Sequence, residues 1–134
     1  MKIRGTLLTF DKIYGPHYPH MFTKDTKFNI PDKIPFTWNF NAYDPKSILG
    51  DVKTFVTEKG ISIEGDIFNE SILKYIEPSW GLGGFYSRVR HHEKDDISII
   101  DEVTIAEVAM VPNPISDDLK FVIGGKLEAF KEDQ

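Results

Sequence analysis

The sequence contains no cysteine among its 134 residues. This absence excludes disulfide bonds, thiolate zinc sites and a cysteine nucleophile. It is consistent with a protein from a reducing compartment. Any chemistry must therefore come from other side chains, such as histidine, serine or the carboxylates.

Long apolar runs and an excess of positive charge are also missing. The longest apolar stretches have about four residues, far fewer than the ~20 that a membrane-spanning helix requires. No secretion signal opens the chain, so we expect a soluble protein that is not conventionally secreted and has no membrane contact. The 21 acidic residues outnumber the 16 basic ones, for a net charge of −5. Proteins that bind nucleic acid usually present a basic face, so nucleic acid is not an expected partner.

What the chain does have is the composition of an ordinary globular protein. It is 40% hydrophobic, 13% aromatic and 28% charged, which excludes the disordered, collagen-like and low-complexity classes. At this length we expect one domain that covers residues 1–134.

Short strands dominate the first half of the chain. Residues 2–10 and 34–40 are rich in β-forming and aromatic residues, which predicts two strands. Residues 11–33 lie between them and carry three prolines and a glycine, which predicts a packed loop. Apolar and polar residues alternate over 52–57 and again over 61–67, and this pattern predicts a β-hairpin.

A short helix and further strands are predicted in the second half. Asn69 is a favourable N-cap, and the apolar residues of 70–77 (Ile72, Leu73 and Ile76) share one helical face before Pro78. Residues 80–90 form a glycine-rich entry to a strand, and 91–96 are predicted to form a polar turn. Strands are then predicted within 97–111 and 119–130, the last interrupted by Gly124-Gly125. The expected fold is α+β, mainly β: a small antiparallel, barrel-like sheet with one or two short helices.

Neither the histidines nor the glycines form a recognisable metal or nucleotide site. His17 and His20 are three residues apart in the proline-rich loop, and His91 and His92 are adjacent, but neither pair has carboxylates at ligand spacing. The glycines of residues 81–84 lack the strand–loop–helix context and the lysine of a phosphate-binding loop. They favour a bulge or a close backbone approach instead. We therefore expect no metal and no cofactor.

Glu107 and Ser87 are the polar side chains of greatest interest in the predicted strands. Glu107 alternates with apolar neighbours such as Ile105 and Ala109, so it is expected either to be buried with a partner or to lie at a solvated edge. Ser87 alternates with Phe85 and Val89. A serine becomes a nucleophile only beside a base, so an ordinary strand serine is the simpler interpretation.

Three stretches of the chain resemble the prohead maturation proteases of tailed phages, serine proteases related in fold to the herpesvirus assemblins. RGTLLTFD, residues 4–11, resembles the first strand of that family. Residues 34–67 resemble its apolar strand that ends in a catalytic His-Asp, followed by a short loop and a hairpin. EVTIAEVAMVPNPIS, residues 102–116, resembles the closing strand, which is followed by proline and a small-residue turn. Together the three stretches cover close to half of the chain.

The departures from the family fall on its catalytic positions. The resemblance places Phe40 where the histidine base belongs and Asn41 where the aspartate follows it. It places Gly83, or Gly84 if the register slips by one, at the serine nucleophile. Glu107 matches an acidic residue of the family, which would orient the histidine. Base and nucleophile act as a unit, so this resemblance implies an inactive member.

A shifted site that uses Ser87 with His91 or His92 is the enzymatic alternative. Strand residues four or five apart lie ~13–17 Å apart, so these side chains could meet only across a sharp turn. The chain would then be an active capsid maturation protease. A third interpretation is a regulatory partner of a separate, active prohead protease.

The resemblance favours a non-catalytic head protein of a phage or prophage, either a capsid auxiliary or decoration protein or an assembly component. Its expected partners are the major capsid protein or other head proteins, and it could form an oligomer. The expected location is the virion or prohead, and the host cytoplasm during assembly. Apolar side chains of the proline-rich loop and near the vacated site are the candidate contacts, because interfaces are enriched in aromatic residues and methionine. They are Tyr14, Tyr18, Met21, Phe22, Trp80 and Tyr86. The alternative for each is that it fills the core of the domain.

Overall fold

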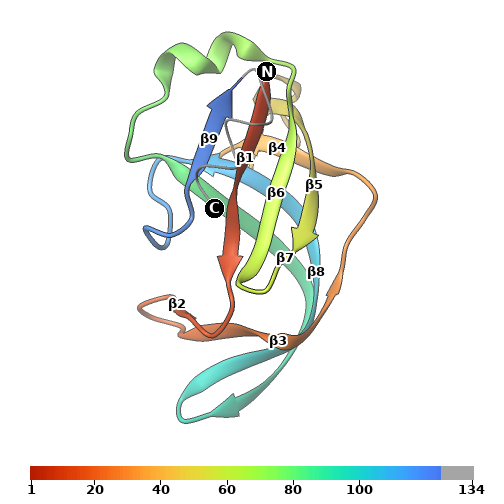
Figure 1. Ribbon diagram of the computed structural model, residues 1–134, viewed down its shortest axis with the longest axis vertical. Coiled ribbons are helices and arrows are strands. Elements are labelled where there is room, and N and C mark those ends of the chain that lie inside the picture. The colour runs from red at the N-terminus through yellow and green to blue at the C-terminus, as the bar shows by residue number, and fades with distance from the viewer. Residues whose placement is uncertain (125–134) are drawn as a thin grey trace.

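The computed structural model describes residues 1–124 and shows a mainly-β fold whose sheet curls into a half-barrel (Figure 1). The strands, in chain order, are β1 (Lys2–Thr9), β2 (Ile13–Tyr14), β3 (His20–Asn29), β4 (Ile34–Trp38), β5 (Ile48–Val56), β6 (Gly60–Ile67), β7 (Gly81–Lys94), β8 (Ile97–Val111) and β9 (Phe121–Gly124). The helical segments among the described residues are the short 3-10 helices η1 (Pro45–Ser47) and η2 (Glu70–Tyr75). The predicted fold class, mainly β and barrel-like, is confirmed.

The sheet runs in the order β2-β3-β8-β4-β5-β6-β1-β9, and β7 pairs with β8. Most neighbours are antiparallel, but β3 and β4 both run parallel to β8, which departs from the purely antiparallel sheet expected. Main-chain hydrogen bonds then draw the ends of the curled sheet together. Leu82 N of β7 donates to Leu119 O at 2.9 Å, and Thr6 N of β1 donates to Lys120 O at 2.9 Å. The segment before β9 therefore bridges β7 and β1.

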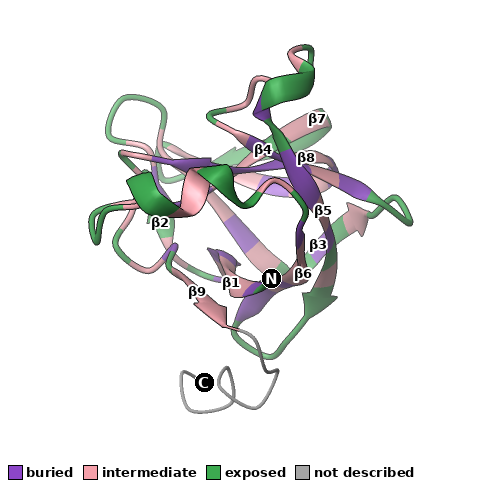
Figure 2. Cartoon of the chain, turned by 90° about the horizontal axis from the view of Figure 1, so that it is seen from above, coloured by how far each residue is buried: buried purple, intermediate pink, exposed green. Residues whose placement is uncertain are grey.

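The core lies inside this curl. Figure 2 looks at the molecule from above and shows buried residues along the strands, with many of the exposed residues in the loops and at strand ends. The aliphatic side chains that are at most 1% exposed come from strands on all sides of the curl, among them Ile3, Leu8, Ile34, Ile63, Leu82 and Ile105. The core therefore depends on the convergence of strands that are far apart in the sequence.

The hairpin predicted between residues 52 and 67 is confirmed as β5 and β6. The register pairs Val52 with Gly65 and Val56 with Ile61. Val52, Ile61 and Ile63 are all at most 1% exposed, so the period-two alternation places one face in the core as expected.

The predicted helix near residues 70–77 exists, but as the shorter 3-10 helix η2. The Asn69 side chain caps it by accepting from Ser71 N at 3.3 Å. The apolar face predicted for this helix, Ile72, Leu73 and Ile76, packs half-buried against the core. Pro78 follows the helix closely, so only a short helical segment is formed.

The prediction of a packed loop over residues 11–33 is wrong for much of that range, because His20–Asn29 forms strand β3. Two of the three prolines in this range, Pro19 and Pro31, flank the strand rather than interrupt it. The alternation that would reveal a strand is missing because the register shifts between Phe22 and Lys27. Pairing with β8, some eighty residues later, stabilises β3, and no local pattern predicts that contact.

The prediction of a polar turn over residues 91–96 is also wrong in part. β7 extends to Lys94, and the turn is confined to Asp95 and Asp96, whose φ angles of 53° and 64° are both left-handed. Two left-handed central residues are typical of the tight type I′ hairpin turn. The polar residues before the turn are strand residues at the end of a long hairpin.

β9 confirms the start of the last predicted strand, and residues 125–130 of that prediction lie outside the described residues. Within residues 1–124, no helix has the length and apolar character needed to cross a membrane.

Candidate functional site

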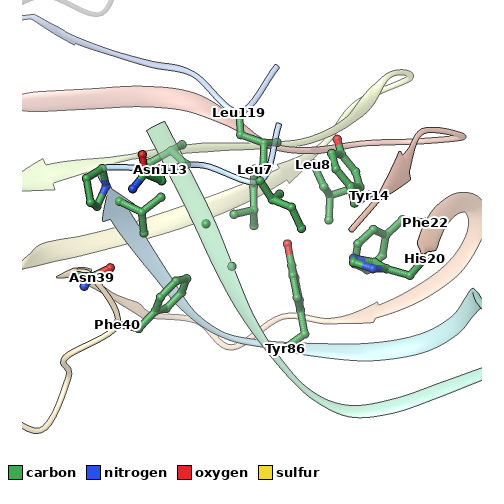
Figure 3. Close-up of a pocket in the computed structure, with 16 residues that line it drawn as sticks. Leu7, Leu8, Tyr14, His20, Phe22, Asn39, Phe40, Tyr86, Asn113 and Leu119 are labelled. Atoms are coloured by element: carbon green, nitrogen blue, oxygen red, sulfur yellow. The ribbon is translucent and has the colours of Figure 1, made fainter. Parts of the chain in front are cut away.

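A cavity of about 540 Å³ lies between β1 and the start of β7 (Figure 3). Most of its lining is aliphatic or aromatic, and the remainder is glycine, proline, histidine and asparagine. The lining residues are Leu7, Leu8, Tyr14, His20, Phe22, Asn39, Phe40, Leu82, Gly83, Gly84, Tyr86, Val111, Pro112, Asn113, Ile115 and Leu119.

Three of the candidate binding residues line this cavity together: Tyr14, Phe22 and Tyr86. Tyr14 and Phe22 are only 4% and 2% exposed, so they anchor the segment around β2 and β3 in the core. The Phe22 and Tyr86 rings lie 5.2 Å apart, between centroids, and form one wall. These side chains face the interior of the molecule rather than its outer surface.

The other candidate contacts, Tyr18, Met21 and Trp80, are not among the residues that line the cavity. The Tyr18 side chain is 86% exposed in the loop between β2 and β3. Trp80 is half-buried and packs on Trp38, with 4.6 Å between ring centroids. Tyr18 is thus the member of the candidate set that projects furthest into solvent.

Asp118 holds Tyr14 in its place at the cavity wall. Its carboxylate accepts hydrogen bonds from Tyr14 Oη at 2.6 Å, from Thr9 Oγ1 at 2.6 Å and from Lys12 Nζ at 2.8 Å. These bonds lower the pKa of Asp118 far below its ordinary value, although burial acts in the opposite direction. Burial, reinforced by Asp118, raises the pKa of Tyr14 to about 12. This cluster could not be predicted from the sequence, because Asp118 lies more than a hundred residues from its three partners.

Phe40 closes one end of the cavity by packing on Gly83. It follows β4 in a tight turn in which both Asn39 and Phe40 are left-handed, with φ angles of 51° and 62°. Asn41 N donates to Trp38 O across this turn, and Asn39 N donates to Met110 O of β8. A Cβ built at Gly83 would lie 2.8 Å from Phe40 Cζ, so the ring occupies the space above the glycine. A left-handed backbone is unusual for a bulky aromatic residue and marks this turn as a strained feature.

Glu107 stays in line with Ala109 in β8 but not with Ile105, its other apolar neighbour in the sequence pattern. Phe85 pairs with Glu107 but the next residue, Tyr86, pairs with Ile105, so Ala106 is an extra residue in β8. Such a bulge reverses which side chains face the core. Ile105 remains in the core, whereas half-buried Glu107 shares the opposite face with Ala109.

The partner of Glu107 is the fully buried Thr37 of β4, whose Oγ1 donates to Glu107 Oε2 at 2.5 Å. Gly83 pairs with Ala109, two residues beyond Glu107. Gly83 and Glu107 therefore lie on neighbouring strands, and the Phe40 ring lies over Gly83. Three residues far apart in the sequence are thus brought to one region of the β4–β8–β7 sheet.

The structure does not bring Ser87 to the histidines. β7 continues from Ser87, which pairs with Thr104, to His91 and His92, which pair with Ile100 and Ile99. The sharp turn that a shifted site would need lies beyond both histidines, at residues 95 and 96. His92 Nδ1 instead lies 2.8 Å from Asp101 Oδ1 on the exposed hairpin.

His17 and His20 do not form a metal site with other ligands either. His20 Nδ1 lies 3.1 Å from Tyr18 O, and the imidazole stands edge-on to Phe22 at the cavity wall. Across the part of the chain that the structure describes, no three histidine, aspartate or glutamate side chains gather in a way that could hold a metal ion.

Comparisons with protein-family models, with curated proteins and with solved structures found no match to this chain.

Proposed function

We propose that this chain is a non-catalytic phage head protein with a prohead-protease-like fold, acting as a capsid auxiliary, decoration or assembly component. The observation that carries the proposal is the contact between Phe40 and Gly83 beside Glu107. The family resemblance assigns these positions to base, nucleophile and orienting acid. Their proximity in space supports the resemblance, because the three positions were matched to the family by sequence alone.

The same contact supports the absence of serine chemistry at this place. A phenyl ring cannot accept a proton, and glycine carries no hydroxyl group. The Phe40 ring also covers the position that a side chain at Gly83 would occupy. Glu107 is engaged by Thr37 rather than by a histidine. Loss of either base or nucleophile removes most of the activity of a serine protease.

In this role, exposed side chains would contact the other head proteins. Tyr18 at the loop between β2 and β3 is 86% exposed, and Phe85 and Val89 of β7 are 54% and 43% exposed. Aromatic side chains are enriched at the centres of protein interfaces. The buried Tyr14 and Phe22 then support the loop from below, and the net charge of −5 makes a nucleic-acid contact unfavourable.

The experiment is copurification of tagged variants with proheads and virions of the encoding phage. We expect Tyr18→Ala and Phe85→Ser to lower the amount of chain bound per particle. Tyr43→Ala is the matched control, because Tyr43 is 88% exposed in a different loop and should bind as the unmodified chain does. Equal binding by all variants would contradict the assigned contact surface. A chain that never sediments with particles would contradict the proposed function itself.

A further inference from the structure

The cavity between β1 and β7 has the features of a preformed small-molecule site. Its walls include Leu7, Leu8 and Leu82, each at most 1% exposed and fixed in paired strands. Ligand sites in proteins are typically cavities of about 300–1,000 Å³, mainly apolar with a few polar groups, and the mouths of β-barrels are common locations. At about 540 Å³ this cavity lies within that range.

Among residues 1–124, which the structure describes, the lining carries no aspartate, glutamate, lysine or arginine. An ionic ligand would therefore lose its hydration without gaining a partner of opposite charge, which is costly. Two of the polar lining residues are already engaged, because Tyr14 Oη donates to Asp118 and His20 Nδ1 lies within hydrogen-bond distance of Tyr18 O. The lining thus favours a neutral molecule with few polar atoms.

The hydroxyl group of Tyr86 is a polar group of the lining that projects into the cavity. Figure 3 shows the Tyr86 ring extending across the cavity with its oxygen directed towards Leu7. This hydroxyl forms no hydrogen bond with the residues that the structure describes, and the Tyr86 side chain is half-buried, so the group is open to the cavity. Burial raises the pKa of Tyr86, so the group stays protonated and able to donate at neutral pH. The ring has room in this position because residue 84 is glycine, since a Cβ there would overlap the ring.

We propose that this cavity binds a neutral, largely apolar small molecule carrying one carbonyl or ether oxygen, which accepts a hydrogen bond from the Tyr86 hydroxyl. The apolar part of the molecule contacts Leu7, Leu8 and Phe22. This binding is independent of head assembly, so the copurification experiment and the one below can fail separately.

Three probes of nearly the same shape separate the parts of this proposal. Acetophenone has an aromatic ring and a carbonyl acceptor, α-methylstyrene replaces the carbonyl oxygen by carbon, and benzoate adds a charge. Binding is followed by titration in ¹H–¹⁵N NMR spectra of the full chain. We expect acetophenone to bind with a Kd of about 1 mM or tighter and to shift the amide signals of Leu8, Gly84 and Tyr86. Benzoate should bind at least about tenfold more weakly.

Tyr86→Phe is the decisive variant, and Tyr18→Phe, which removes an exposed hydroxyl, is its matched control. Tyr86→Phe should weaken the binding of acetophenone about two- to tenfold and leave the binding of α-methylstyrene unchanged. Tyr18→Phe should change neither. The proposal is overturned if no probe binds, if the shifted signals lie away from the cavity, if benzoate binds as tightly as acetophenone, or if the two variants behave alike.

Discussion

Replacing Gly83 by alanine measures how closely the Phe40 ring covers β7. The added Cβ would lie 2.8 Å from Phe40 Cζ and 3.3 Å from Cε2, both shorter than ordinary carbon contacts. The ring or its strained turn must therefore move. Overpacking of this kind typically costs about 1–3 kcal/mol of the free energy of unfolding.

The same substitution should have the opposite effect once the ring is gone. In a Phe40→Ala background the nearest neighbour outside residue 40 is Val111 Cγ1, 3.7 Å from the new Cβ, which is an ordinary contact. Alanine is then more favourable than glycine in a strand by about 0.5–1 kcal/mol, because it loses less backbone freedom on folding. The two effects give a coupling of about 1.5–4 kcal/mol between the positions.

Urea denaturation of the four proteins, namely wild type, both single variants and the double variant, provides the measurement. Midpoints are compared at a common m-value, so that a change in midpoint reports a change in stability. If Gly83→Ala changes the free energy of unfolding by the same amount with and without the Phe40 ring, the contact is refuted. That result would also remove the main structural support for the assignment of these two positions.

Three further predictions follow from other contacts of the structure. Because burial and Asp118 raise the pKa of Tyr14 from 10.0 to about 12, Tyr14 favours folding below pH 10 and this stability is lost as the pH rises towards 12. Between pH 8 and 11 wild type should lose about 1.4 kcal/mol more unfolding free energy than Tyr14→Phe, and equal losses would contradict the raised pKa of Tyr14. Thr37→Val leaves Glu107 without its donor and should cost about 1.5–3 kcal/mol in thermal unfolding, whereas no cost would show that the bond is unimportant. A serine-directed covalent probe should not label the chain, and labelling abolished by Ser87→Ala would favour the active-protease alternative.

The sequence was most informative where local pattern and burial coincide. The hairpin of β5 and β6 has alternating apolar and polar residues on both sides of a short turn, so its existence and the face that packs in the core were predictable. Asn69 was identified as a helix cap for the same reason, because capping depends on adjacent residues. The helix itself is only the 3-10 helix η2, and its length is decided by packing that the sequence alone does not reveal.

The errors concern features that depend on distant partners. β3 contains charged and polar residues and becomes a strand through parallel pairing with β8. The polar end of β7 is stabilised across the hairpin, for example by Ser98 Oγ donating to Glu93 Oε1 at 2.7 Å. The bulge at Ala106 moved Glu107 away from the core face, and one extra residue in a strand cannot be recognised from alternation alone.

The sequence allowed the residues of the candidate site to be named, but it did not predict the cavity that most of them line. Phe40, Gly83 and Glu107 were singled out by the family resemblance, and Tyr14, Phe22 and Tyr86 by their aromatic character. The cavity that joins most of them arises because β1 and β7 are bridged by Leu119 and Lys120, a long-range contact with no sequence signature.

Quantitative mass spectrometry of phage proheads and virions purified from cells that express this chain tests the proposed head role most directly. If the chain is a non-catalytic head component, it should be present in one or both particles at many copies, with its own termini uncleaved. Absence from both particles, in cells where the protein is shown to be expressed, would contradict the structural role and leave a regulatory partner of a separate protease.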